Sequence, residues 1–262
     1  MMLIFVSTTY TLLSEDFDGV TPPSLPVGWY VVDGNSDGFT WRTYDNTATA
    51  DSLSCGNSDL HGFFTSKYAC YDDDDAGSSA PTGDDDLATP MIRINQHGTP
   101  NAVRLIYTFA YEDVGNPEDT FYVFVRLFDS SGTTVVPVAY YYDVPDVSGA
   151  PDTSGVDTID LTGLTAGKDS MIVFFTYRDN PGSADWGWGA AVDNVVVEVD
   201  VTTTEVAESP VRLNGRTVRA ESGEIYDVSG RLVGTFRGKY TFREPGVFFV
   251  KTQRGVRRVI VR

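Results

Sequence analysis

The sequence predicts an all-β protein, a jelly-roll β-sandwich followed by a small Ig-like β-sandwich, and three observations support this prediction. Alternating apolar and polar residues recur along the chain, whereas the 3.6-residue periodicity of helices is nearly absent. Gly, Pro, Asp and Asn bound these runs, which is typical of short strands joined by turns. With 262 residues, of which 41% are hydrophobic, the chain can bury one large core or two smaller ones.

Seven segments have the composition of strands, being rich in Val, Ile, Phe and Tyr. Their sequences are NAVRLIYTFAYE, DTFYVFVRLFD, DSMIVFFTYRD, AAVDNVVVEVD, GEIYDVSG, GVFFVKT and VRRVIVR. Many short strands with turn signals between them favour a sandwich or jelly roll. The first four segments belong to the predicted large sandwich, and the last three belong to the tail.

Charge divides the chain into two parts of opposite sign. Residues 205–262 hold 12 Lys and Arg against 6 Asp and Glu, a net charge of +6, whereas residues 1–204 hold 7 against 31, a net charge of −24. The Thr-rich run VDVTTTEVAESPVRL between them is typical of a short linker. We therefore place a boundary near Thr203, with an acidic domain at residues 1–203 and a basic domain at residues 204–262.

The formal charge of the whole chain, −18, argues against a nucleic acid as partner, because phosphate binding depends on a basic surface. Cations are the expected small ligands. No apolar run approaches the roughly 18 residues that a membrane-spanning helix needs. The start, MMLIFVSTTYTLLSEDF, lacks a basic region and a cleavage motif. Residues 1–14 are therefore an ordinary first strand, the remnant of a signal peptide, or a start truncated relative to a precursor.

Two cysteines, Cys55 and Cys70, lie on either side of the segment GNSDLHGFFTSKYA. In a secreted chain they would pair and close a loop of roughly 15 residues. Two buried free thiols are the alternative. A zinc site is not expected, because only His61 lies nearby and zinc takes four ligands.

The clearest candidates for metal ligands lie near the N-terminus, in SEDFDG and DGNSDG. Asp16 and Asp18 alternate with Phe17, so a strand would place both carboxylates on one face and the ring on the other. Asp33 and Asp37 are closely spaced, with glycines that permit a sharp turn. Such oxygen donors suit calcium, although the EF-hand pattern is missing. The alternative is a turn held by Asx hydrogen bonds.

Several segments in a fixed order resemble the MAM-like jelly rolls of bacterial surface proteins, which include the cleaved-adhesin and choice-of-anchor J families. The segments are EDFDG, a Pro-rich stretch, GW, DGNSDGFTW, DDDLATPMI, RLIYTFAYE, DTIDLTGLTAGKDSMIVFFTYRD and WGWGAAVDNVVVE, over about residues 14–199. The resemblance implies a calcium-stabilised jelly roll that serves in adhesion or in binding glycans and proteins, as one module of a secreted protein.

The same resemblance implies particular calcium ligands. An acidic residue of the first strand, Asp16 or Asp18, is expected to meet Asp193 of the last strand near the metal. Asp33 and Asp37 match the DGDG turn of these families, although two inserted residues lengthen the turn in this chain.

Other polar and aromatic clusters allow two interpretations each. Trp186 and Trp188 would share one face of a regular strand, either as a stacking platform for a sugar or as packing at the sandwich edge. Tyr140, in VAYYYDV, is expected to pack in a half-buried strand. The acidic runs at 72–75 and 84–86 are expected in one loop, either solvated or holding calcium weakly, because unpaired carboxylates repel one another.

Catalysis has little support in this sequence. The two histidines, His61 and His97, lie far apart, and no G-x-S-x-G or H-E-x-x-H motif is present. A glycosidase needs only two well-placed carboxylates, but nothing singles out such a pair. We therefore expect a protein that is not an enzyme.

The tail resembles the C-terminal sorting domain of the type IX secretion system, over about residues 208–262. That family has a hydrophobic-D-x-x-G-R-x-V turn, a P-G-x-Y-x-V strand and a basic last strand. The matching residues here are Asp227, Gly230, Arg231, Val233, Pro245, Gly246, Val250, Arg258 and Val261. The resemblance implies recognition by the export machinery of an outer membrane. The alternative is an ordinary C-terminal stability domain.

Together these observations predict a secreted or cell-surface adhesion or binding protein, stabilised by calcium and exported through its C-terminal domain. Its expected partners are a glycan or protein ligand on a surface and the export machinery. The alternative is a structural subunit that self-assembles head to tail into an extracellular filament or sheath, because the two domains carry opposite charge.

Overall fold

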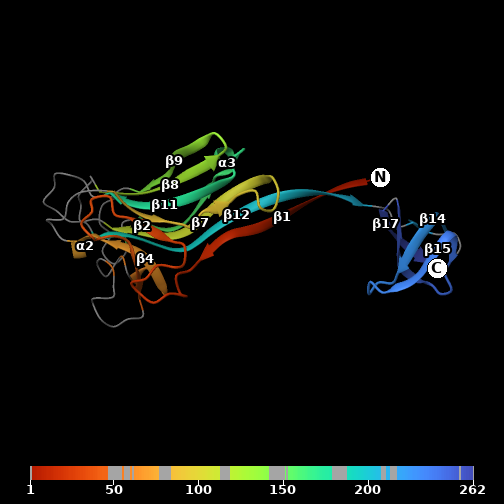
Figure 1. Cartoon of the computed structure of the whole chain (residues 1–262). Helices are drawn as coiled ribbons and strands as arrows, with labels where there is room; N and C mark the ends of the chain where they lie inside the picture. The colour runs from red at the N-terminus through yellow and green to blue at the C-terminus, as the bar shows by residue number, and fades with distance from the viewer. Residues whose placement is uncertain are drawn as a thin grey trace. The chain divides into compact units, whose positions relative to one another are not determined.

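The computed structural model (Figure 1) describes residues 2–46, 55, 60, 62–76, 84–112, 119–141, 151, 153–178, 188–207, 211–212, 217–253 and 255–261. The chain divides into two compact units, Ser7–Thr202, and Met1–Val6 with Thr203–Arg262. The division after Thr202 adjoins the boundary placed from the sequence, whereas the first six residues group with the tail. No helix among the described residues is long and apolar enough to cross a membrane.

The larger unit is a sandwich of two largely antiparallel sheets, so the all-β prediction is confirmed. The first sheet has the strand order β10-β7-β12-β4-β3, and β1 also pairs with β12. Its strands are β1 (Met2–Glu15), β3 (Arg42–Asp45), β4 (Lys67–Asp72), β7 (Pro100–Glu112), β10 (Thr153–Asp160) and β12 (Gly189–Ala207). One-turn helices α2 (Asp73–Ala76) and α3 (Thr162–Thr165) lie in the connections.

The second sheet has the strand order β2-β5-β11-β8-β9, with β6 also paired with β11. Its strands are β2 (Tyr30–Val32), β5 (Asp84–Ala88), β6 (Ile92–Arg93), β8 (Thr120–Asp129), β9 (Gly132–Tyr141) and β11 (Ser170–Arg178). Figure 1 shows β8, β9 and β11 forming one layer of the sandwich.

Alternation along the strands builds the core between the two sheets. In β8, Phe121, Val123 and Val125 are fully buried, while the residues between them are only partly buried. They join one cluster with inward residues of the other sheet, such as Leu105 and Tyr107 of β7. Fully burying a side chain of this size contributes about 1.5–3 kcal/mol, so this cluster is the main source of the stability of the unit.

The outer face of the first sheet is covered by a second cluster that contains the disulfide. Cys55 and Cys70 are bonded across a sequence separation of 15 residues, and both are fully buried. Leu60 and Phe64 pack against the disulfide, together with Tyr68 of β4, whose hydroxyl accepts a hydrogen bond from the backbone N–H of Cys55 at 3.3 Å. Of the alternatives left open by the sequence, the structure has the paired cysteines.

The tail unit forms one five-stranded sheet of order β13-β17-β16-β14-β15. Its strands are β13 (Val211–Arg212), β14 (Thr217–Tyr226), β15 (Leu232–Thr241), β16 (Gly246–Thr252) and β17 (Gly255–Val261). Only the pair β13 and β17 runs parallel. Its small core centres on Ile225, Phe236, Phe242, Val250 and Val259.

We expect the double substitution Cys55→Ser with Cys70→Ser to lower the free energy of unfolding by about 3 kcal/mol, because the bond restricts a loop of about 15 residues in the unfolded chain. Chemical denaturation of both proteins measures this difference. Reduction of the wild-type protein should give the same loss and should leave the double variant unchanged. Equal stability of the oxidised wild-type protein and the variant would contradict the prediction.

Candidate functional site

Three of the predicted metal ligands, Asp16, Asp18 and Asp193, lie near enough to one another for the charges of the first two to act on the third. Asp16 and Asp18 follow the end of β1, and Asp193 lies in β12 with only 3% of its surface exposed. Burial, followed by the charges of Asp18 and Asp16, raises the pKa of Asp193 to about 6. Both Asp16 and Asp18 therefore interact electrostatically with Asp193, whereas the family resemblance implied only one of the two.

Irregular backbone conformations occur next to these carboxylates. Phe17 and Asn194 have left-handed φ values of 54° and 51°, and β12 has a register shift between Asp193 and Val196. Such an irregularity changes the direction in which the neighbouring side chains of the strand point. Phe17 itself is fully buried and packs edge-on against Trp29 at 5.2 Å between ring centroids, so ring and carboxylates point apart.

In the structure the oxygens of this cluster accept hydrogen bonds from the protein. Asp18 Oδ1 accepts the backbone N–H of Lys67 at 3.1 Å, and Asp193 accepts the backbone N–H of Asn194 at 2.6 Å. The Lys67 ammonium lies against the backbone, donating to the carbonyl of Asp18 at 3.0 Å. Among the described residues, no three His, Cys, Asp or Glu side chains converge as a metal-binding group.

Asp33 and Asp37 lie apart from that cluster, in a turn of Asx hydrogen bonds. Asp33 accepts the backbone N–H groups of Ser36 at 2.5 Å, Asp37 at 3.3 Å and Gly38 at 3.0 Å. This geometry is that of the Asx turn. One oxygen, Oδ2 of Asp37, is buried and has no hydrogen-bond partner among the residues that the structure describes.

The turn packs against Asp85 of β5, which the sequence analysis considered only as part of the acidic run 84–86. Asp85 is 1% exposed and accepts the backbone N–H of Gly34 at 3.3 Å. A Cβ at Gly34 would overlap the carbonyl oxygen of Asp84, so only glycine permits this close approach. Burial, opposed by the Gly34 hydrogen bond, raises the pKa of Asp85 to about 7.

The predicted acidic loop is divided in the structure. Residues 84–86 form β5 rather than a loop, with Asp85 buried and its two neighbours partly exposed. Residues 72–75 end β4 and begin α2. Trp188 is partly buried just before β12, while Trp186 and His61 lie outside the described residues.

A surface that the sequence analysis missed is the outer face of the second sheet, which we call the aromatic face. Its rings are Tyr30 of β2, Tyr122, Phe124 and Phe128 of β8, Tyr140 of β9 and Phe174 of β11. Tyr140 is 50% exposed and Tyr30 is 39% exposed, whereas Phe174 is fully buried beneath its neighbours. The cluster on this side consists of residues from this sheet alone.

The rings of this face are held in ordered pairs. Phe124 and Phe174 are stacked at 4.5 Å between centroids with 5° between their planes. Tyr122 and Tyr140 are opposite each other across β8 and β9 and are stacked at 5.6 Å. Tyr30 meets Phe174 edge-on at 6.3 Å. Aromatic pairs in such geometries favour one arrangement of the rings.

Two carboxylates and two guanidinium groups lie among the rings. Arg178 donates to both oxygens of Asp84, at 2.5 and 2.8 Å, and lies over the ring of Tyr122 at 5.3 Å. The Arg178 hydrogen bond lowers the pKa of Asp84. Arg126 lies over Phe174 at 4.7 Å.

Asp86 has a different environment from Asp84. It accepts the hydroxyl of Thr176 at 2.6 Å, and burial raises its pKa to about 6. The aromatic face thus combines partly exposed rings with hydrogen-bonding groups that neighbouring residues already orient. One signal in the sequence could have indicated it: the segment TFYVFVRLF of β8 is apolar at both alternating sets of positions.

The residues carried over from the sorting-domain resemblance lie in three places of the tail sheet. Asp227, Gly230 and Arg231 form the turn between β14 and β15. There Asp227 Oδ1 accepts the backbone N–H of Arg231 at 3.1 Å, and Gly230 has a φ of 80°. Pro245 and Gly246 lead into β16, and Arg258 is exposed on β17.

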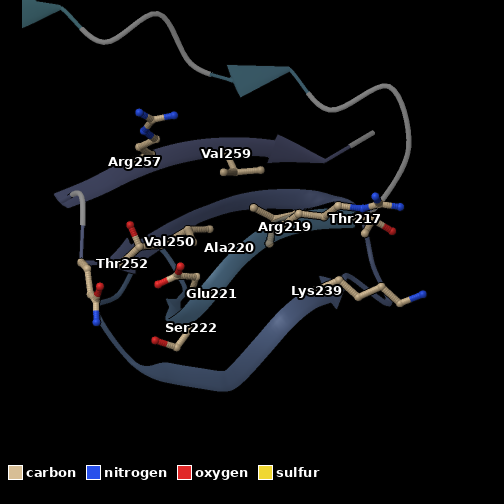
Figure 2. Close-up of a pocket in the computed structure, with 12 residues that line it drawn as sticks. Thr217, Arg219, Ala220, Glu221, Ser222, Lys239, Val250, Thr252, Arg257 and Val259 are labelled. Carbon is tan, nitrogen blue, oxygen red and sulfur yellow. The ribbon is translucent and has the colours of Figure 1, made fainter.

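The tail also contains a groove, shown in Figure 2. It has a volume of about 720 Å³ and lies between β14 and β15 on one side and β16 and β17 on the other. Its lining residues are Thr217, Val218, Arg219, Ala220, Glu221, Ser222, Lys239, Val250, Thr252, Gln253, Arg257 and Val259. None of the residues carried over from the sorting family lines it except Val250.

No protein-family model matches this chain, and no curated protein matches it. Solved structures with similarity include two cleaved adhesin domains of Lys-gingipain from Porphyromonas gingivalis. The K1 domain is 19% identical with a TM-score of 0.46, covering 72% of this chain and 97% of that domain. The K3 domain is 18% identical with a TM-score of 0.46, covering 73% and 99%.

A third similar structure is the xylan-binding domain CBM22-1 of Xyn10C from Paenibacillus barcinonensis. It is 12% identical with a TM-score of 0.41, and the match covers 72% of this chain and 94% of that domain. Because the identities and TM-scores are this low, the function of this chain has to be argued from its own residues.

Proposed function

We propose that this chain is a secreted or cell-surface, non-enzymatic binding protein that recognises a glycan through its aromatic face. The observation that carries the proposal is the combination of partly exposed, mutually stacked rings with oriented carboxylate and guanidinium groups on one sheet. Ligand sites of this type join apolar contact area to a few fixed polar groups that set orientation.

The chemistry of a sugar ring matches this combination. A pyranose presents C–H groups on its faces and hydroxyls around its rim, so it can contact an aromatic ring and donate to a carboxylate at the same time. Tyr122 and Tyr140 supply ring surface at the edge of the sheet. Asp86 and the Arg178–Asp84 pair lie beside them in the same face.

Preorganisation supports the same assignment. Tyr122 is fixed by three neighbours: it stacks on Tyr140, lies under Arg178 and donates its hydroxyl to Asp84 at 3.2 Å. A ring that is already ordered loses little conformational entropy when a ligand binds. A protein ligand is the second partner expected from the sequence, and the experiment below separates the two.

We expect Tyr140→Ala and Tyr122→Ala each to weaken glycan binding about tenfold, equivalent to about 1.4 kcal/mol, because each removes ring surface from the face. A glycan array probed with the wild-type protein identifies an oligosaccharide, and calorimetry then measures its affinity for each variant. Val156→Ala is the matched control, because Val156 is 69% exposed on β10 of the other sheet.

Unchanged glycan affinity in both tyrosine variants would contradict the assignment of the face. The absence of any glycan ligand on the array, together with capture of a surface protein that Tyr140→Ala abolishes, would assign the face to a protein ligand instead.

We also propose that calcium binds at Asp16, Asp18 and Asp193. The support is that Asp193 is buried and that the charges of Asp18 and Asp16 act on it, which raises its pKa, so a cation would offset an unfavourable charge. To bind calcium, the carboxylates of Asp18 and Asp193 would give up some of the hydrogen bonds that they accept from the protein. The Asp33 and Asp37 turn fits less well, because both oxygens of Asp33 already accept backbone N–H groups.

We expect the carboxyl of Asp193 to titrate near pH 6 in chelator and well below that in millimolar calcium, measured by carbon NMR. The raised pKa means that the stability contributed by the protonated form is present below about pH 4 and is lost as the pH rises through about 6. Calcium should therefore raise the melting temperature at pH 7.5 more than at pH 4.5.

The matched variants for calcium are Asp193→Asn and Asp75→Asn. The first should abolish the calcium-dependent rise in melting temperature at pH 7.5. The second should keep it, because Asp75 lies in α2, where it pairs with Arg42 at 3.7 Å. If the wild-type protein had the same melting curve with calcium and with chelator, the proposed calcium site would be contradicted.

For the tail we propose recognition by the export machinery of an outer membrane, as its resemblance implies. The support is its net positive charge and the presence, in the family's order, of the Asp227 turn, the Pro245–Gly246 entry to β16 and the basic strand β17. Head-to-tail assembly into a filament, the alternative, would use the opposite charges of the two parts of the sequence.

A further inference from the structure

The groove in the tail results from a change in the course of β14. This strand pairs with β15 along its whole length, but it pairs with β16 only at 224–226. A register shift between Ala220 and Ser222 marks a bulge in β14, and bulges bend the strand that carries them. The first half of β14 therefore departs from β16, and the groove opens where the two strands separate.

Gly223 marks the point of separation. A Cβ at this position would lie 2.6 Å from the ring of Phe236 and 2.8 Å from the carbonyl oxygen of Lys251. The strands are thus in close contact at Gly223 and no longer paired before it. Among the described residues, no strand pairs with residues 217–222 of β14 on the side away from β15. An unpaired strand edge presents backbone groups that another strand can use.

The floor of the groove is the core of the tail itself. Val250 and Val259 line the groove and are only 3% and 2% exposed, and both belong to the hydrophobic cluster of the tail. Val218 and Ala220 pack against the same cluster from β14. Figure 2 shows Ala220, Val250 and Val259 among the side chains that line the groove. An extended chain in the groove would place every second side chain on this apolar floor.

The rim of the groove carries three positively charged side chains, Arg219, Lys239 and Arg257. Arg219 and Lys239 are direct Cα partners across β14 and β15, and like charges placed opposite each other are destabilising. Arg257 lines the other side from β17. None of the three forms an ion pair with another described residue, and Glu221 is the one acidic residue among the described lining residues.

We propose that this groove binds an extended acidic segment of a partner protein, which adds to the edge of β14 along residues 217–222. Backbone hydrogen bonds to β14 would hold the segment, as in other cases of strand addition. Its apolar side chains would lie on Val218, Ala220, Val250 and Val259, while its acidic side chains would pair with Arg219, Lys239 and Arg257. The proposal concerns the tail alone and does not depend on glycan binding.

A synthetic peptide of alternating Asp and Val tests this proposal with the full chain. We expect saturable binding in fluorescence polarisation, and none with a peptide in which Lys replaces Asp. Arg257→Glu should weaken binding at least tenfold. Arg258→Glu is the matched control, because it makes the same change of charge at the adjacent residue of β17, which does not line the groove.

Amide hydrogen exchange supplies a second measurement that electrostatic attraction alone would not change. Bound acidic peptide should increase the protection of amides within residues 217–222 and leave the turn at Asp227 unaffected. Equal loss of affinity in Arg257→Glu and Arg258→Glu, or no added protection in β14, would overturn the proposal. Protection of the same amides in a dimer of the protein without peptide would also overturn it, by assigning the groove to a second copy.

Discussion

Each sheet of a two-layer sandwich has one face in the core and one face that must be covered by other structure or contact water. In this protein the two outer faces are treated differently. The outer face of the first sheet lies under a cluster that contains the disulfide of Cys55 and Cys70. Among the described residues, the cluster on the outer face of the second sheet consists of side chains from that sheet, although its central strand β11 is buried almost throughout. The proposed ligand surface follows from this difference.

The carboxylates of this acidic chain have different local environments in the structure. Arg178 neutralises Asp84 directly, whereas Asp85, Asp86 and Asp193 have raised pKa values because burial removes water from them. A sequence gives only the number of carboxylates. Which of them is paired, capped by backbone N–H groups or desolvated depends on the strands that fold over them, and this decides which can bind a cation or a hydroxyl.

The strands were predictable because apolar alternation is local: the segments predicted at β7, β8, β11, β16 and β17 agree with the structure within a few residues, whereas β12 continues past its predicted segment to Ala207. GEIYDVSG was predicted as a strand, but the strand ends at Tyr226, where Asp227 begins the turn. The proximity of Asp16, Asp18 and Asp193 followed from a family resemblance. The aromatic face did not follow, because alternation shows that β8 has two apolar sides but not which one remains uncovered. The bulge of β14 has no clear signal in the sequence, so the groove was also missed.

Among its described residues the aromatic face carries two carboxylates, Asp84 and Asp86, and two guanidinium groups, Arg126 and Arg178, whose formal charges cancel within an otherwise acidic unit. Ionic strength screens attraction between charged groups over about 8 Å under physiological conditions, but it has little effect on ring contacts and hydrogen bonds to a neutral ligand. Contacts at this face would therefore persist at high ionic strength, while binding of an acidic segment in the basic tail groove would weaken. Ionic strength would thus change the affinity of the tail groove for its ligand and leave that of the aromatic face nearly unchanged.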